Sequence, residues 1–119
     1  MTPVVVSFSS AADELGGRVA RFLGGGFVQL QGQSEAALKL QRWFAEGTPI
    51  IGICAAGILI RLLAPVLSDK QNEPPVIAVS TDGKHVVPLL GGHHGANRMA
   101  EEIAFALGDS VKLAWEGNT

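Results

Sequence analysis

The sequence predicts an α/β fold in three layers: a mostly parallel sheet of the doubly wound or flavodoxin-like type, with helices on both faces and an antiparallel hairpin. Apolar runs without alternation, which are typical of strands buried on both faces, are separated by segments in which apolar residues recur at helical spacing. The chain has 119 residues, of which 47% are hydrophobic and 17% charged, so it can bury a core of its own. We therefore expect residues 1–119 to form a single α/β domain. Its last residues, 116–119, contain no pattern that would end the fold, so we expect this domain to be the N-terminal part of a longer chain.

Three apolar runs in the first half of the chain predict strands. Residues 3–8 include three consecutive valines and are expected to lie centrally in the sheet, and residues 27–30 and 49–54 supply two more runs. Helical segments separate these runs. Strict alternation of this kind favours parallel strands joined by right-handed crossovers.

Capping residues and glycines predict where the first two helices begin and end. Ser10, with Asp13 three positions later, resembles a capping box, and the glycines at 24–26 end that first helix. Ser34 is expected to cap the second helix, which Gly47 closes. The buried face of the second helix is predicted to carry Ala37, Leu38, Leu40, Trp43 and Phe44.

A hairpin is predicted in the second half of the chain. Residues 76–80 and 85–89 are apolar runs on either side of Asp82 and Gly83. An Asp-Gly pair in this position favours a type I′ turn, in which both central residues have a positive φ. The sheet is therefore expected to be mixed.

Helical segments flank the hairpin on both sides. Residues 55–67 form the first, with Arg61 as its only charge, and residues 97–107 form an amphipathic helix that Gly108 ends. Residues 111–115 are expected to form a last strand.

Charge and composition disfavour several classes of function. The formal net charge is −2 and the basic residues are scattered, so nucleic-acid binding is not expected. The chain has no run of about 18 apolar residues and no signal-peptide pattern, so we expect no membrane association and a cytoplasmic location. It also lacks phosphate-loop and dinucleotide-binding fingerprints, and its three histidines and one cysteine show no metal-ligand spacing, so neither a cofactor nor a metal is expected.

The residues that point most strongly to chemistry are Gly91, Gly92, His93, His94 and Gly95, between a predicted strand and a predicted helix. A helix N-terminus has about four backbone N–H groups without intrahelical partners and the positive end of the helix dipole, so it binds carboxylate, sulfate or phosphate. Glycines let the backbone approach such an anion, and histidine side chains exchange protons near neutral pH. The alternative is a glycine-rich connection whose histidines are solvated.

Other polar side chains are weaker candidates. Cys54 ends an apolar strand and has no base beside it in the sequence, which favours a buried thiol over a nucleophile. Ser9 and Ser10 follow the first strand, and doubly wound sheets bind ligands at the carboxyl ends of their strands, although helix capping is an alternative role for Ser10. His85 is predicted to be solvated.

An ordered string of residues in the second half of the chain resembles a known family. It runs through Arg61, Asp69 with Lys70, Pro74 or Pro75, Gly83, Pro88-Leu89-Leu90 and Gly92-His93-His94-Gly95-Ala96-Asn97. Over residues 52–108 this string is similar to the N-terminal region of the CbiG family, the cobalt-precorrin-5A hydrolases of anaerobic cobalamin biosynthesis. It departs from the family pattern at His94, where an apolar residue is more usual, and has one glycine fewer before Ala96. Family members carry a further C-terminal domain, and some are fused to a precorrin methyltransferase.

The resemblance implies a substrate and a reaction. The δ-lactone of a ring-contracted cobalt tetrapyrrole, cobalt-precorrin-5A, is opened by hydrolysis with loss of the former bridging carbon as acetaldehyde. Acetate and propionate groups make this tetrapyrrole anionic, so fixed positive charges and backbone N–H groups suit its site. The residues expected to bind it are Arg61, Lys70, Gly91, Gly92, His94, Gly95 and Asn97.

Lactone hydrolysis also needs a base that activates water and an acid for the leaving oxygen, and one histidine can serve as either. His93 is the expected catalytic histidine. Asp69 is expected to orient it, and a surface ion pair with Lys70 is the alternative role for Asp69. Asn97 either donates to the developing oxyanion or caps the helix.

Two other interpretations remain open at the level of the sequence. One is a non-catalytic corrinoid-binding or docking module of a larger cobalamin-biosynthesis enzyme, which recognises the corrinoid or docks another pathway enzyme while catalysis takes place elsewhere in the full chain. The other is a flavodoxin-like domain that binds a phosphorylated ligand at residues 91–97, which the missing nucleotide fingerprints disfavour.

Overall fold

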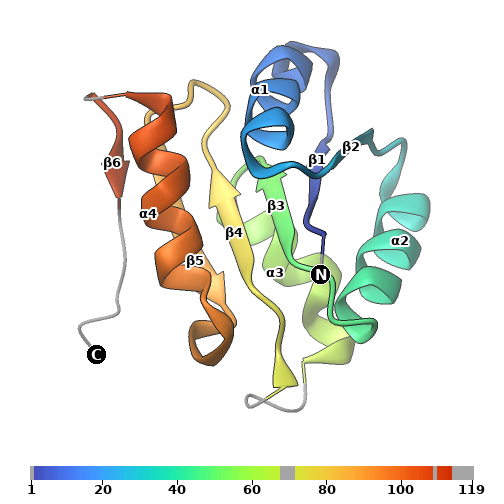
Figure 1. The fold of residues 1–119 in the computed structure, drawn as a ribbon. Helices are drawn as coiled ribbons and strands as arrows, with labels where there is room; N and C mark the ends of the chain where they lie inside the picture. The colour runs from blue at the N-terminus through green and yellow to red at the C-terminus, as the bar shows by residue number, and fades with distance from the viewer. Residues whose placement is uncertain (1, 68–71, 109, 114–119) are drawn as a thin grey trace.

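The computed structural model describes residues 2–67, 72–108 and 110–113, which form one mixed sheet with helices packed on both faces (Figure 1). The helices are α1 (Asp13–Leu23), α2 (Gln33–Ala45), α3 (Ala56–Leu63) and α4 (Ala96–Leu107), with 3₁₀ turns η1 (Ser10–Ala12), η2 (Ala64–Val66) and η4 (Gly92–His94). The strands are β1 (Val4–Ser7), β2 (Gly26–Gln29), β3 (Ile50–Ile53), β4 (Val76–Val79), β5 (His85–Leu90) and β6 (Lys112–Leu113).

The strands lie in the order β2-β1-β3-β4-β5-β6. β1 pairs in parallel with β2 and with β3, and β3 pairs in parallel with β4. β5 then runs antiparallel to β4, and β6 runs parallel to β5. This arrangement confirms the predicted mostly parallel sheet with an antiparallel hairpin.

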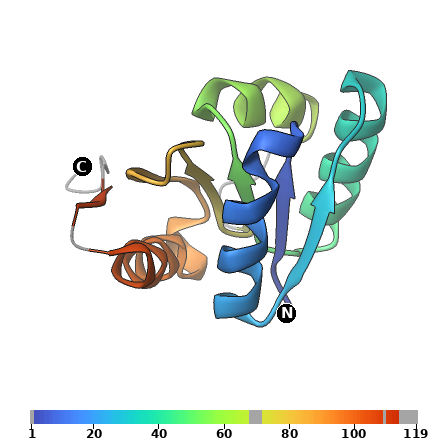
Figure 2. The ribbon, with the colours of Figure 1, turned by 90° about the horizontal axis from the view of Figure 1, so that it is seen from above.

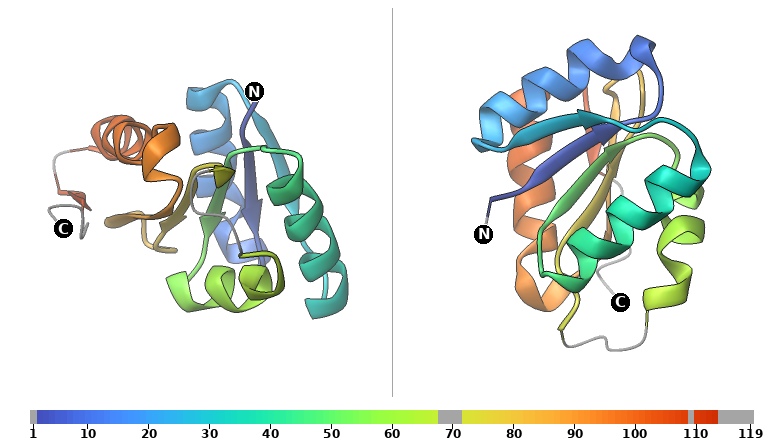
Figure 3. Two further views of the ribbon diagram at one scale, coloured as in Figure 1. Left: turned by 90° about the horizontal axis from the view of Figure 1, so that it is seen from below. Right: turned by 90° about the vertical axis from the view of Figure 1, so that its right-hand side faces the viewer.

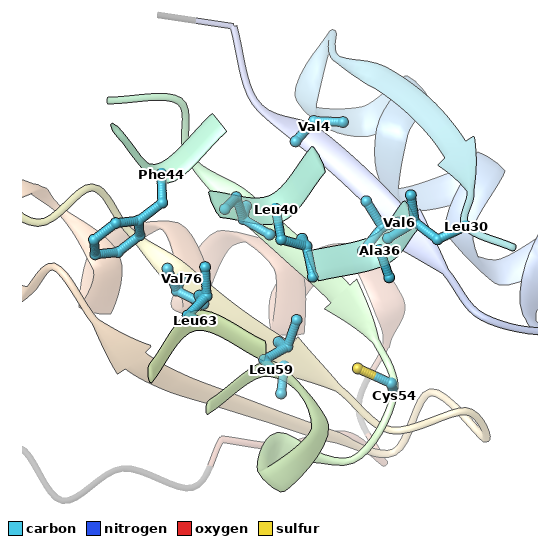
Figure 4. Close-up of a cluster of buried hydrophobic side chains, with 12 residues drawn as sticks. Val4, Val6, Leu30, Ala36, Leu40, Phe44, Cys54, Leu59, Leu63 and Val76 are labelled. Carbon is cyan, nitrogen blue, oxygen red and sulfur yellow. The ribbon is translucent and has the colours of Figure 1, made fainter. Parts of the chain in front are cut away.

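Helices α2 and α3 cover one face of the sheet, and α1 and α4 cover the other (Figures 2 and 3). Alternate residues of the central strands point to the two layers. On β1, Val4 and Val6 pack with α2 and α3, in the cluster drawn in Figure 4, whereas Val5 packs with α1 and α4. Every residue of β1, β3 and β4 is buried, which explains why these strands appear in the sequence as unbroken apolar runs.

Both predicted helix caps are wrong. Asp13 does not close a capping box with Ser10, because its carboxylate accepts a hydrogen bond of 2.8 Å from the buried Ser7 hydroxyl, which needs a partner. The N-cap of α1 is Ala12, and it makes no side-chain hydrogen bond. The N-cap of α2 lies two residues earlier than predicted, because Gly32, with a φ of 80°, takes that position and Ser34 is already inside the helix that begins at Gln33.

The buried face of α2 also differs from the predicted one. Ala36, Leu40 and Phe44 are buried, whereas Leu38 is 68% exposed. The helix therefore rests on positions spaced by four residues, and Leu38 lies on the solvent side.

The hairpin between β4 and β5 forms as predicted, but its turn is not type I′. Gly83 has a positive φ of 74°, and no residue other than glycine has a positive φ within the described chain, so Asp82 does not. Instead the amide of Gly83 donates to the Ser80 carbonyl (2.8 Å), and the Asp82 carboxylate accepts from the Ser80 hydroxyl (2.6 Å) and the Lys84 amide (2.9 Å). These hydrogen bonds stabilise a longer loop, and the one with Ser80 is the main reason why the pKa of Asp82 lies below its usual value.

Candidate functional site

Residues 91–97, which we call the histidine turn, join β5 to α4. The amides of His94 and Ala96 both donate to the Gly91 carbonyl, at 2.9 and 3.2 Å, and the Met99 amide donates to the Gly95 carbonyl at 2.9 Å. The φ angles of Gly91 and Gly95 are 84° and 96°, in the left-handed region that favours glycine. The predicted sequence of strand, glycine turn and helix is therefore present.

The middle of the histidine turn, residues 92–95, lies open on the surface, between the buried Gly91 and Ala96. His93 and His94 are exposed, Asn97 is half-buried, and the first turn of α4 carries no acidic residue. Gly95 is the N-cap of α4, so Asn97 does not cap the helix. The exposed residues 92–95 directly before α4, which include both histidines, form a surface that suits an anion.

The three glycines of the turn have different surroundings. A Cβ added to Gly91 would lie 2.6 Å from the Cα of Pro75 and in contact with the Pro74 carbonyl, so this glycine is required by packing against the segment before β4. Gly92 and Gly95 have no such neighbour within 4 Å. Only these two leave open space that a ligand can approach.

His94 lies beside a shallow cleft of about 400 Å³ at the end of the sheet where β1 to β4 begin, which we call the amino end. Leu90 of β5 pairs with Val76, the first residue of β4, so the antiparallel direction of β5 brings the histidine turn to this end. The other residues of the cleft are Gly47, Pro49, Asn72, Glu73, Pro74, Pro75 and Met99.

Arg61 lies in a different place. It projects from α3 into a cleft of about 460 Å³ next to Phe8 and Leu30, which follow the last residues of β1 and β2. This is the carboxyl end of the sheet. A four-residue strand rises about 13 Å, so the structure does not bring Arg61 to the histidine turn as one compact site.

Sequence reasoning did not identify Phe8 and Gln33, which line the same cleft as Arg61. The signal was present in the position of Phe8, directly after a central strand of a doubly wound sheet, where ligands commonly bind. Asp69 and Lys70 lie outside the described residues, so their predicted roles stay predictions.

The remaining candidates occupy ordinary structural environments. Cys54 is buried at the end of β3, and burial raises the pKa of its thiol to about 12, which disfavours the thiolate that a nucleophile requires. Ser9, Ser10 and His85 are exposed. Among the described residues no group of three or more His, Cys, Asp or Glu side chains is placed to hold a metal ion. Within the same residues, no helix has the length and apolar character needed to cross a bilayer.

Comparison with known proteins identifies the family of this chain. The model of the family described as Cobalamin synthesis G N-terminal (CbiG_N) matches residues 39–111, which is more than half of the chain and includes Arg61 and the whole histidine turn. The chain belongs to this family.

Two curated relatives carry the name cobalt-precorrin-5A hydrolase. The protein from Salmonella typhimurium is 38% identical over 84 residues, which are 70% of this chain and 23% of that protein. The protein from Priestia megaterium is 39% identical over 71 residues, which are 59% of this chain and 19% of that protein. The chain thus matches less than a quarter of the length of these relatives.

A solved structure supports the fold of this CbiG_N chain. The crystal structure described as a cobalamin biosynthesis protein G homologue from Sulfolobus solfataricus aligns with a TM-score of 0.73 at 22% sequence identity. The alignment covers 95% of this chain and 36% of the other. At this level of identity the likeness shows the α/β fold alone.

Proposed function

We propose that the chain is the N-terminal part of a cobalt-precorrin-5A hydrolase, which opens the δ-lactone of an anionic cobalt tetrapyrrole in the cytoplasm and releases acetaldehyde. Membership of the CbiG_N family and the names of the two curated relatives support this function. The observation that carries it is the histidine turn, which lies within the family match and presents two exposed histidines at the start of α4.

In this proposal the open backbone at Gly92 and Gly95, the side chain of His94 and the start of α4 bind a substrate carboxylate or the oxyanion that develops on the lactone carbonyl. Backbone N–H groups at a helix start can donate hydrogen bonds to an oxyanion. Because the helix already holds them in place, they stabilise the developing charge without reorganising during the reaction. Asn97 is proposed to add a side-chain N–H to this site; it is the second residue of α4, and the N-cap is Gly95.

His93 acts as the general base that takes a proton from water, and then as the acid that returns it to the leaving lactone oxygen. Water adds to the lactone carbonyl, the acyl carbon to oxygen bond breaks, and a carboxylate and a hydroxyl group result. The hydroxyl group is then on the former bridging carbon. When it loses its proton and becomes a carbonyl, the bond from this carbon to the tetrapyrrole breaks, the bonding electron pair and a proton stay with the tetrapyrrole, and acetaldehyde leaves. A positioned histidine contributes about 10²–10⁴-fold to such a step. Asp69 and Lys70 are proposed to orient His93 and to hold a substrate carboxylate, and Arg61 holds another carboxylate at the carboxyl end of the sheet.

A second candidate function is a non-catalytic module that binds the corrinoid while another part of the protein performs the hydrolysis. Two observations favour it. The chain matches less than a quarter of the length of its curated relatives, and within the described residues no side chain is hydrogen-bonded to His93 to orient it.

Release of acetaldehyde from cobalt-precorrin-5A separates these functions. The native protein that contains this chain is incubated with the substrate, and acetaldehyde is measured by coupled reduction with NADH. The hydrolase proposal predicts acetaldehyde release that His93→Ala reduces about 100-fold or more without loss of substrate binding. If His93→Ala retains its single-turnover rate at saturating substrate, the catalytic assignment is wrong and the binding module takes its place.

A further inference from the structure

The cleft around Arg61 has the composition of a binding site for an apolar group that carries a negative charge. Its walls are largely apolar and come from segments that are distant in the sequence: Phe8 after β1, Leu30 after β2, and Ile58 and Leu62 of α3. Arg61 and Gln33 supply its polar groups. A cleft of about 460 Å³ lies within the usual range for small-molecule sites, which are mostly apolar with a few placed polar groups.

Arg61 is available to bind a ligand. The ion pairs between described residues join Lys39 to Glu35 and Arg98 to Glu102, and Arg61 takes part in neither. A Cβ added to Gly57 would lie 3.9 and 4.0 Å from the two terminal nitrogens of Arg61. The Arg61 guanidinium therefore lies beside Gly57, in the first turn of α3.

The local electrostatics favour an anion beside this guanidinium. The first turn of α3 contains no acidic residue, and its N-cap, Ala55, makes no side-chain hydrogen bond, so the positive end of this helix is not neutralised by its own side chains. The N-terminus of α2 reaches the same cleft through Gly32 and Gln33. The acidic residue in the first turn of α2, Glu35, lies 3.3 Å from Lys39 and accepts from the Gln31 amide (2.8 Å).

We propose that this cleft binds one carboxylate-bearing pyrrole ring of the tetrapyrrole substrate, with the ring against Phe8, Ile58 and Leu62 and the carboxylate on Arg61. The inference rests on the proposed function, which supplies the tetrapyrrole. A tetrapyrrole contains four such rings and is too large for a cleft of this volume, so one ring enters and the others remain outside. The cleft therefore positions the substrate and takes no part in proton transfer.

The test uses indole-3-acetate, a stable apolar ring with one acetate group, and its neutral analogue indole-3-acetamide. Each is titrated into the isotope-labelled 119-residue chain while backbone amide shifts are followed by NMR. We expect indole-3-acetate to shift the backbone amide signals of Phe8, Gly32, Gln33 and residues 58–62. It should also bind about tenfold more tightly than indole-3-acetamide, because only the acetate forms a charge-assisted hydrogen bond with Arg61.

A matched pair of variants isolates the charge. Arg61→Gln should lower the affinity for indole-3-acetate about tenfold and leave that for indole-3-acetamide unchanged. Arg21→Gln is the control, because Arg21 on α1 lies beside Gly17 as Arg61 lies beside Gly57, but on the opposite face of the sheet. The proposal is overturned if the shifts map to the histidine turn, if both probes bind equally, or if the two variants behave alike.

Failure of this inference can be told apart from failure of the proposed function. In the native protein, Arg61→Gln should raise KM for cobalt-precorrin-5A and leave kcat within about twofold. If this variant still releases acetaldehyde and its KM is unchanged, the hydrolase proposal holds and the proposal that the cleft binds substrate is wrong. If the probe shifts map to the cleft but the native protein releases no acetaldehyde, the cleft is a binding site and the hydrolase proposal is wrong.

Discussion

Replacing Gly91 by alanine should destabilise the protein by about 2–5 kcal/mol, because two separate costs fall on this residue. Its φ of 84° is unfavourable for an L-residue by about 1–2 kcal/mol. The new Cβ would also lie 2.6 Å from the Cα of Pro75, and overpacking against buried backbone costs about 1–3 kcal/mol.

Two neighbouring glycines serve as matched controls. Gly95 has a φ of 96° but open space around it, so Gly95→Ala should show the backbone cost alone, about 1–2 kcal/mol. Gly92 has neither a positive φ nor a close neighbour, and Gly92→Ala should change stability by less than about 1 kcal/mol. Urea unfolding followed by circular dichroism gives all three values. Equal losses for Gly91→Ala and Gly95→Ala would show that contact with Pro75 does not decide the requirement for glycine at residue 91.

The remaining predictions concern activity and pH. His93→Ala should slow acetaldehyde release from cobalt-precorrin-5A about 100-fold or more, whereas His94→Ala should have a milder effect, as measured by single-turnover kinetics. Arg61→Ala should raise KM more than it lowers kcat in steady-state assays, since its proposed task is to hold a carboxylate. The raised pKa of Cys54, about 12, means that above about pH 9 the unfolded chain loses this proton and the folded chain keeps it. Stability should therefore fall by about 1.4 kcal/mol per pH unit between about pH 9 and 12, and Cys54→Ala, unfolded by urea in parallel, should lack that part of the slope.

Most of the strand and helix pattern was predictable because it follows from burial on two faces. Residues 4–6 and 50–53 are apolar without interruption, and central strands of a parallel sheet produce this pattern. Helix caps were less predictable, since they depend on partners distant in the sequence. Nothing local to Asp13 indicates that the buried hydroxyl of Ser7 would take its carboxylate.

The local elements of the candidate site were predictable from the sequence, whereas the spatial relation between its distant residues was not. The strand, glycine turn and helix around His93 and His94 are local features, and the structure contains them where the sequence predicts them. The separation of Arg61 from these histidines depends on the direction of β5, which decides the end of the sheet at which the turn lies. The apolar walls that Phe8 and Leu62 give to the Arg61 cleft depend on the order of the strands, which spacing along the chain does not reveal.

The β4–β5 hairpin also has a consequence for the order of folding. The hairpin pairs Val79 with Val86, which are close in the sequence, whereas the pairing of β1 with β3 joins Val4 to Ile50, which are far apart. Closing the hairpin therefore costs less chain entropy than pairing β1 with β3. In pulse-labelling hydrogen exchange we expect amides of β4 and β5 to become protected before those of β1. The histidine turn, which follows the hairpin directly, would then take its shape early in folding. The Arg61 cleft, whose walls extend from Phe8 to Leu62, would form only when the parallel strands come together.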